Sequence, residues 1–121
     1  MHTWRRTIVW DVSTGDPIVP APRIVRLPRV LGPDLRVLGY APETVVAEKA
    51  VTILERGTTS TRWRDFVDIV LVRNRCQLDP AAMVEAVRAV ATARRVALRP
   101  IGEVVDGYGA IGQARVARLD P

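Results

Sequence analysis

The stretch that decides the fold is Pro42–Arg56, which reads PETVVAEKAVTILER. At 100° per residue its apolar side chains gather on one broad face, which predicts an amphipathic helix packed against a core. A proline and an acidic residue belong in a first helical turn, and Gly57 is well placed to end the helix. The face that we expect to be buried consists of Val46, Ala47, Ala50, Val51, Ile53 and Leu54.

Two more helices are expected after the first. Residues 58–61 form a hydroxyl-rich linker and N-cap for a helix that extends to about Arg73. Asp79-Pro80 provides an N-cap and a first-turn proline for a helix that extends to about Arg95. In the helix before Arg73, the apolar side chains expected to be buried are Trp63, Phe66, Val67 and Val70.

The chain before these helices is expected to be extended. Six prolines between Pro17 and Pro42 exclude long helices there. Three β-branched or apolar runs, residues 7–12, 24–27 and 35–40, predict strands separated by turns. A small N-terminal β unit followed by three helices is an α+β fold, which we expect to be a single, incomplete domain over residues 1–121. The glycine-containing tail, residues 97–121, is expected to form a short strand and a loop.

Charge gives a weak indication of function. The chain has 121 residues, of which 18 are basic and 13 acidic, for a formal net charge of +5. Seventeen of the basic residues are arginine, and Lys49 is the only lysine. A basic surface attracts nucleic acids, but a GC-rich genome also favours arginine over lysine, and we consider that background explanation the stronger one.

Composition excludes several classes of protein. With 48% hydrophobic and 26% charged residues the chain is typical of a globular protein, not of a disordered one. It has no apolar run long enough to cross a bilayer and no apolar stretch of the signal-peptide kind, which predicts a cytoplasmic protein. A single cysteine, Cys76, excludes an internal disulfide, and His2, the only histidine, makes a histidine-ligated zinc site improbable.

Lys49 and Arg56 lie along one line of the first helix, at the edge of its apolar face. Two cations on such a line suit the phosphates of a nucleotide, because a lysine stem can follow the apolar surface while its ammonium reaches a cleft. The alternative is a solvated flank on which Glu48 and Glu55 neutralise these cations. Local sequence favours the flank.

Three aspartates are candidates for chemistry. Asp65 and Asp68 are three residues apart in the second helix, so their carboxylates share one face and can hold a divalent metal or act as acid and base. Salt bridges with Arg62 and Arg64 are the alternative and the more usual fate. Asp11 interrupts an apolar strand, where it either faces solvent or serves a site at the strand edge. Asp16 is interpreted as a turn residue.

Three segments, taken in order, resemble one family. They are Asp11-Val-Ser-Thr-Gly-Asp-Pro17, Pro42-Glu-Thr-Val-Val-Ala-Glu-Lys49-Ala, and Arg62-Trp-Arg-Asp65-Phe-Val-Asp68-Ile. They resemble D-x-x-x-G-D-x-x-x-P, E-T-x-x-A-E-K and R-x-[KR]-D-x-x-D of the AbiEii/AbiGii nucleotidyltransferase toxins, a DNA polymerase β-type group of bacterial toxin–antitoxin systems that includes MenT-like members. The resemblance covers about residues 7–73.

The resemblance implies a reaction and roles for residues. It implies transfer of a nucleoside monophosphate from an NTP to an acceptor, tRNA in MenT-like members, with Mg²⁺ as cofactor and a cognate antitoxin as partner. Lys49 matches the catalytic or nucleotide-contacting lysine, and Asp65 the acidic residue of the last motif. Asp68 is its companion, and Asp11 matches a third carboxylate that could hold metal. Glu48, Arg56, Arg62 and Arg64 are supporting candidates.

One departure from the family pattern limits this expectation. Complete members carry a G-[ST] loop followed by D-x-D, and this sequence contains no D-x-D. The chain therefore resembles the C-terminal half of such an enzyme: either it is a truncated, inactive paralogue, or the upstream half is on a neighbouring polypeptide. We expect the chain alone to be inactive and to expose apolar faces that favour self-association. The alternative is a non-catalytic binding or regulatory module that contacts an antitoxin or nucleic acid through its arginines. The tail after residue 96 does not match the expected family pattern.

Overall fold

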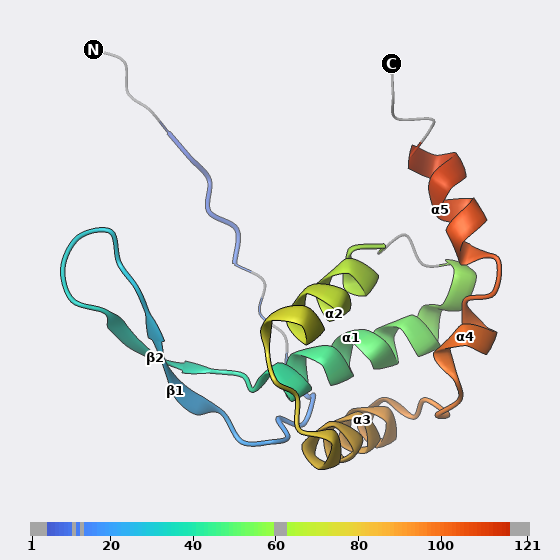
Figure 1. Ribbon diagram of the computed structural model, residues 1–121, viewed down its shortest axis with the longest axis horizontal. Helices are drawn as coiled ribbons and strands as arrows, with labels where there is room; N and C mark the ends of the chain where they lie inside the picture. The colour runs from blue at the N-terminus through green and yellow to red at the C-terminus, as the bar shows by residue number, and fades with distance from the viewer. Residues whose placement is uncertain (1–4, 11, 13, 60–62, 117–121) are drawn as a thin grey trace.

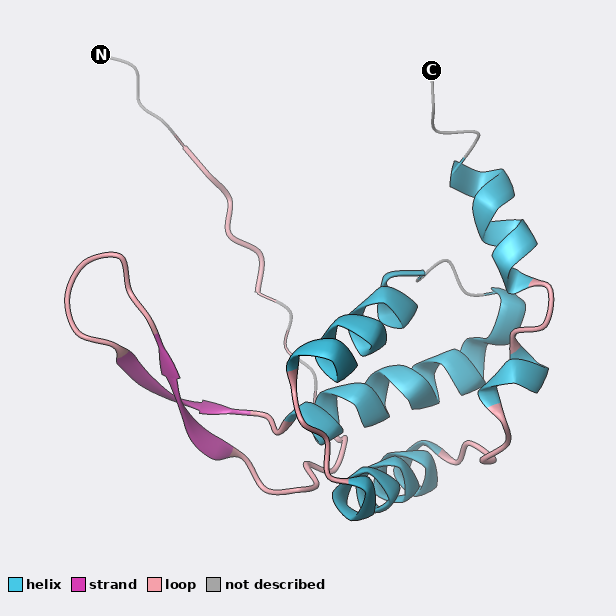
Figure 2. Cartoon of the chain, viewed as in Figure 1, coloured by secondary structure: helices cyan, strands magenta, loops and turns pink. Residues whose placement is uncertain are grey.

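The computed structural model describes residues 5–10, 12, 14–59 and 63–116 (Figures 1 and 2). A two-stranded antiparallel hairpin precedes the helices, so the expected α+β class is confirmed. In chain order the elements are β1 (Arg23–Leu27), β2 (Leu35–Gly39), α1 (Pro42–Arg56), the 3-10 turn η1 (Gly57–Thr59), α2 (Trp63–Arg75), α3 (Pro80–Arg94), α4 (Ile101–Val104) and α5 (Tyr108–Val116).

Helix α1 is the centre of the fold and has the predicted bounds. It lies between α2 and α3, and its six expected apolar residues are all buried. Pro42 occupies the first turn, where a missing N–H costs nothing. Gly57 ends the helix with φ 53° while its N–H donates to the carbonyl of Ile53. Glycine enters this left-handed region without the steric cost that a Cβ brings.

The core lies between α1 and α3. Ala47 and Val51 of α1 pack against three small residues of α3, which are Ala86, Val90 and Ala91. Small side chains at a crossing let two helix backbones approach closely, so this interface is tight but contains little apolar volume. Among the described helices none is long and apolar enough to cross a membrane.

Asp79 fixes the start of α3 in two ways. Its Oδ1 accepts from the N–H of Ala81 at 3.1 Å, as expected for an N-cap, and its own N–H donates to Oε1 of the buried Glu43 at 2.8 Å. We expect Asp79→Ala to lower the free energy of unfolding by about 1 kcal/mol, the usual loss at such a cap. Urea unfolding followed by circular dichroism measures it. Asp79→Ser, which retains an acceptor, is the control, and an equal loss in both variants contradicts the capping role.

The β unit is smaller than expected. The strands predicted at residues 24–27 and 35–40 are confirmed as β1 and β2, which pair with each other from Arg23 opposite Gly39 to Leu27 opposite Leu35. The predicted strand at residues 7–12 is wrong for the described part of that segment, residues 7–10 and 12, which carry no strand. A strand needs a neighbour for its N–H and C=O groups, and here Trp10 is 85% exposed.

The tail is helical, which corrects the expected strand and loop. Its two short helices, α4 and α5, are supported by contacts with distant residues. The ring of Tyr108 stacks on Phe66 of α2 with centroids 5.0 Å apart. Val104 lies against Gly57, where a Cβ would meet its side chain at 3.5 Å. Tertiary support of this kind overrides the low helix propensity of the glycines, which made the local sequence misleading.

Candidate functional site: a lysine between two aspartates

Lys49 of α1 reaches both candidate aspartates of α2. Its Nζ donates to Asp65 Oδ1 at 3.1 Å and to Asp68 Oδ2 at 2.7 Å. The Lys49 side chain is 24% exposed, that of Asp65 is 3% exposed and that of Asp68 is 43% exposed. The ammonium of Lys49 therefore lies between a buried carboxylate, that of Asp65, and a solvent-exposed one, that of Asp68.

This arrangement reverses the expected orientation of α2. Of the four apolar residues expected to be buried, Trp63, Val67 and Val70 are exposed and Phe66 is half-buried, while Asp65 is buried against α1. A buried carboxylate needs a charged partner, and the only such partner at the edge of α1's apolar face is Lys49. We attribute the orientation of α2 to this ion pair, which leaves Trp63, Val67 and Val70 on the exposed side of the helix.

The aspartates keep the ammonium of Lys49 charged. Burial alone would lower the pKa of Lys49, but the hydrogen bonds and charges of Asp68 and Asp65 outweigh burial and raise this pKa above its ordinary value of 10.5. The group is thus a permanent cation at neutral pH. With two carboxylates around one ammonium, the cluster has a formal charge of −1.

A second ionic cluster was missed by the sequence analysis. Arg94, in the last turn of α3, donates through Nε to Asp16 Oδ1 at 2.9 Å and through Nη1 to the hydroxyl of Thr52 at 2.9 Å, and its Nη2 also contacts Asp16. These bonds join the N-terminal segment to α1 and α3. Asp16 was interpreted as a turn residue. The signal that could have singled it out is its place in the G-D-x-x-x-P motif; Arg94 lies 78 residues away and has no local signal.

The pKa values in this second cluster follow from the same contacts. The hydrogen bond from Arg94 lowers the pKa of Asp16, against a smaller opposing effect of burial and with help from the Arg94 charge. The pKa of Glu48 is raised, first by burial and then by the charge of Asp16, although Arg94 and Lys49 oppose this. Glu48 is therefore a weaker acid than Asp16.

The two clusters lie on opposite edges of one strip of α1. At 100° per residue, Lys49 is on the side that meets α2, and Thr52, 60° away, is on the side that meets Arg94. Next to the second cluster is a cavity of about 610 Å³. Its lining residues are Val12, Thr14, Gly15, Asp16, Ile18, Tyr40 and Glu48. Helix α1 thus contributes Lys49 to the first cluster and the adjacent Glu48 to the lining of this cavity, which otherwise comes from the chain before α1.

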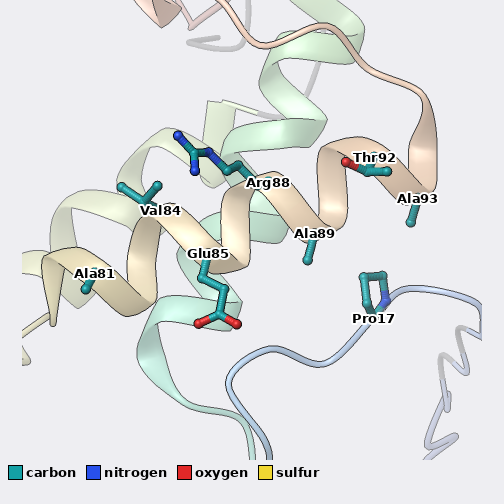
Figure 3. Close-up of a pocket in the computed structure, with 8 residues that line it drawn as sticks. All are labelled: Pro17, Ala81, Val84, Glu85, Arg88, Ala89, Thr92 and Ala93. Atoms are coloured by element: carbon teal, nitrogen blue, oxygen red, sulfur yellow. The ribbon is translucent and has the colours of Figure 1, made fainter.

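A second cavity, of about 650 Å³, lies on the other side of α3 (Figure 3). Half of its eight lining residues are alanine or valine from α3, the others are Glu85, Arg88 and Thr92 of α3 and Pro17 of the N-terminal segment, and none is a predicted site residue. It is a shallow apolar groove that offers few polar groups to orient a nucleotide.

The remaining predicted residues are not brought to Lys49. Arg56 is exposed in the last turn of α1, two turns away. Arg64 is also exposed, and its guanidinium carbon lies 5.8 Å from the centroid of the Trp63 ring. Asp11 and Arg62 lie outside the described residues.

A magnesium site is not formed by the described residues alone. In the parts of the chain that the structure describes, no three His, Cys, Asp or Glu side chains gather closely enough to hold a metal ion. Asp65 and Asp68 direct oxygens at the Lys49 ammonium, a cation that competes with a metal for the same oxygens. Mg²⁺ prefers several oxygen ligands, so this pair does not fit it as arranged.

The structure brings Lys49, Asp65 and Asp68, three residues of the quoted motifs, into one cluster between α1 and α2, and those motifs resemble the ones of nucleotidyltransferases. Comparison with known families supports this class: the sequence model of the family described as "Nucleotidyl transferase AbiEii toxin, Type IV TA system" matches residues 2–118. The chain belongs to the AbiEii nucleotidyltransferase toxins of toxin–antitoxin systems, and a cognate antitoxin is implied. No curated protein and no solved structure matches it.

The extent of the family match corrects one expectation. Resemblance was expected over residues 7–73 only, with a tail that does not belong to the pattern. The match continues to residue 118 and so includes α3, α4 and α5. The helical tail is therefore part of the family region, in agreement with its packing on Phe66 and Gly57.

Proposed function

We propose that this chain acts in the cytoplasm in the transfer of a nucleoside monophosphate from an NTP to tRNA, and that Lys49 contacts the triphosphate. The observation that supports this most is that the only lysine of the chain lies against both aspartates of the last motif. A compact ammonium is suited to a phosphate, and its charge is secured by the raised pKa.

The unequal exposure of the aspartates suggests how the phosphate is admitted. Asp68 is the exposed partner, so a triphosphate oxygen can replace its carboxylate at Nζ while Asp65 keeps the ammonium in place. Lys49 then stabilises charge that develops on the phosphates during transfer. Asp68, once released, is free to interact with the incoming acceptor. In this proposal Asp65 positions Lys49, and Arg56 contributes positive charge along the same helix.

Mg²⁺ remains part of the proposal as the ion that neutralises an NTP in such reactions. We assign it no ligand among the described residues. The motif that supplies metal ligands in complete members, D-x-D, does not occur in these 121 residues. We therefore propose that the chain alone does not complete the transfer and contributes the lysine side of the site.

The binding step can be tested separately from the reaction. We expect Lys49→Arg to weaken binding of ATP, measured by isothermal titration calorimetry with Mg²⁺, by about tenfold, because the longer, planar guanidinium does not take the position of the compact ammonium between Asp65 and Asp68. Arginine preserves the positive charge beside Asp65, so the fold is retained. The control is Arg99→Lys, at an exposed site between α3 and α4. Equal affinity of Lys49→Arg and the wild type contradicts the proposal and favours a non-catalytic module.

The reaction itself has a defined expected result. Incubation of the chain with labelled NTPs, Mg²⁺ and total tRNA is expected to leave the RNA unlabelled, because the D-x-D ligands are missing from the sequence. Incorporation that Lys49→Ala abolishes would disprove the proposed inactivity and at the same time establish Lys49 as catalytic. Incorporation that survives Lys49→Ala would disprove the assigned role of Lys49.

A further inference from the structure

The β1–β2 hairpin carries a concentration of positive charge. Residues 23–39 contain four arginines and one acidic residue, Asp34, which gives a formal charge of +4 − 1 = +3. All four arginines are exposed. They are Arg23, Arg26, Arg29 and Arg36. Over half of the chain's +5 thus lies on one small element.

The register of the hairpin places two of these cations face to face. Arg26 is directly opposite Arg36, so their Cβ atoms share one face of the ribbon about 5 Å apart. Like charges in this position destabilise a strand pair. Neither residue has an ion-pair partner among the described residues, whereas Lys49 and Arg94 both form ion pairs there. The hairpin therefore retains an electrostatic cost that a bound anion would remove.

The hairpin face that carries Arg26 and Arg36 is exposed to solvent. The hairpin projects away from the helices (Figure 1). On the face of Arg26 and Arg36, the neighbouring pair Ile24 and Leu38 is also exposed, Leu38 by 72%. At the tip, Arg29 donates to the carbonyl of Pro33 at 2.6 Å and Val30 is fully exposed. An isolated two-stranded hairpin is at best marginally stable in water, so this surface is suited to a partner.

We infer that the β1–β2 hairpin is an RNA-binding arm in which Arg26 and Arg36 bind backbone phosphates. Two guanidinium groups side by side match a phosphodiester backbone, because each can bind phosphate oxygens in a bidentate manner. Exposed Ile24, Leu38 and Val30 then contact sugars or unstacked bases, as apolar side chains do in nucleic-acid complexes. The inference rests on the proposed function for the kind of acceptor, tRNA, and assigns its binding to a surface that does not include Lys49.

The test uses the full chain and labelled tRNA. In Arg26→Thr/Arg36→Thr the β-branched replacements favour the strand, so the ribbon is kept while both cations are removed. We expect affinity for tRNA to fall at least about tenfold, and the slope of log K against log salt to lose about two, one for each phosphate contact. Thermal unfolding is expected to shift upward in the same variant, because the opposed charges are gone.

The matched control is Arg88→Thr/Arg99→Thr, which removes two exposed arginines from α3 and the loop after it. An equal loss of tRNA affinity in this control shows that net charge alone acts, and overturns the inference. Unchanged tRNA binding in Arg26→Thr/Arg36→Thr also overturns the inference, and the exposed hairpin would then be a surface for a protein partner. A DNA duplex that competes as well as tRNA contradicts the RNA assignment. Lys49→Arg is expected to weaken ATP binding without changing tRNA affinity, so failure of the arm and failure of the nucleotide site are distinguishable.

Discussion

Replacing Lys49 by methionine is expected to lower the free energy of unfolding by about 3 kcal/mol. Methionine preserves the apolar stem but leaves the carboxylate of Asp65, 3% exposed, without its ammonium partner. Removing one member of a buried ion pair costs about 3–5 kcal/mol, and the lower end applies because Lys49 itself is partly exposed. Equilibrium unfolding in guanidinium chloride, monitored by far-ultraviolet circular dichroism, measures the loss.

Two controls assign the loss to the buried carboxylate. Lys49→Met/Asp65→Leu removes both charges and is expected to recover most of the stability, because a buried ion pair is often no better than packed apolar groups. Asp68→Ala removes the exposed partner and is expected to cost only about 0.5–1 kcal/mol. If the double variant is as unstable as Lys49→Met, the unpaired carboxylate of Asp65 is not the cause of the loss.

The same cluster gives a signed pH dependence. The folded-state pKa of Lys49 is raised, so its contribution to stability is complete below pH 10.5, the ordinary pKa of the group. The contribution is lost as the pH rises through the higher folded value. We expect the stability of the wild type to decline in this alkaline range and Lys49→Met to lack this part of the decline. Parallel unfolding curves for the two proteins over that range would contradict the assignment.

Local signals were sufficient for the elements that are fixed by their own sequence. The bounds of α1 and the start of α3 follow from proline, capping and glycine positions, and the hairpin follows from two apolar runs around a turn. The core face of α1 was also predicted from its period alone. In each case the deciding interaction lies within a few residues of the chain, which is what periodicity and turn chemistry report.

The predictions that proved wrong concern elements whose structure depends on residues distant in the sequence. The period of α2 was interpreted with its apolar side inward, but Asp65 is the side chain that turns toward α1 because Lys49, 16 residues earlier, supplies the opposite charge. The helices of the tail depend on Phe66 and Gly57, which no local pattern connects to them. The sequence singled out Asp65 and Asp68 as one candidate pair and Lys49 as a separate candidate. Only the structure shows that Lys49 contacts both aspartates.

Replacing Arg94 by methionine is the second change expected to have a large effect. The variant loses every bond that ties Asp16 and Thr52 to the end of α3, and hydrogen bonds to charged groups contribute about 1.5–3 kcal/mol. We expect a loss of about 2 kcal/mol, because Arg94 is 24% exposed and partly screened. Thermal unfolding measures it, and Arg88→Met, on an exposed face of the same helix, is expected to have little effect.

The dependence of stability on acidic pH distinguishes the Arg94–Asp16 ion pair from general packing. The pKa of Asp16 is lowered by its bond with Arg94, so the contribution is complete above pH 3.8 and is lost as the pH falls through the lower folded value. In Arg94→Met that acid-sensitive part is expected to vanish, and adding Asp16→Asn is expected to cost little more, since the two residues act on one interaction. Fully additive losses would mean that each residue stabilises the fold through other contacts. In that case the N-terminal segment, which lines the acidic cavity beside Glu48, is held in place chiefly by the bond from Thr44 Oγ1 to the carbonyl of Val19.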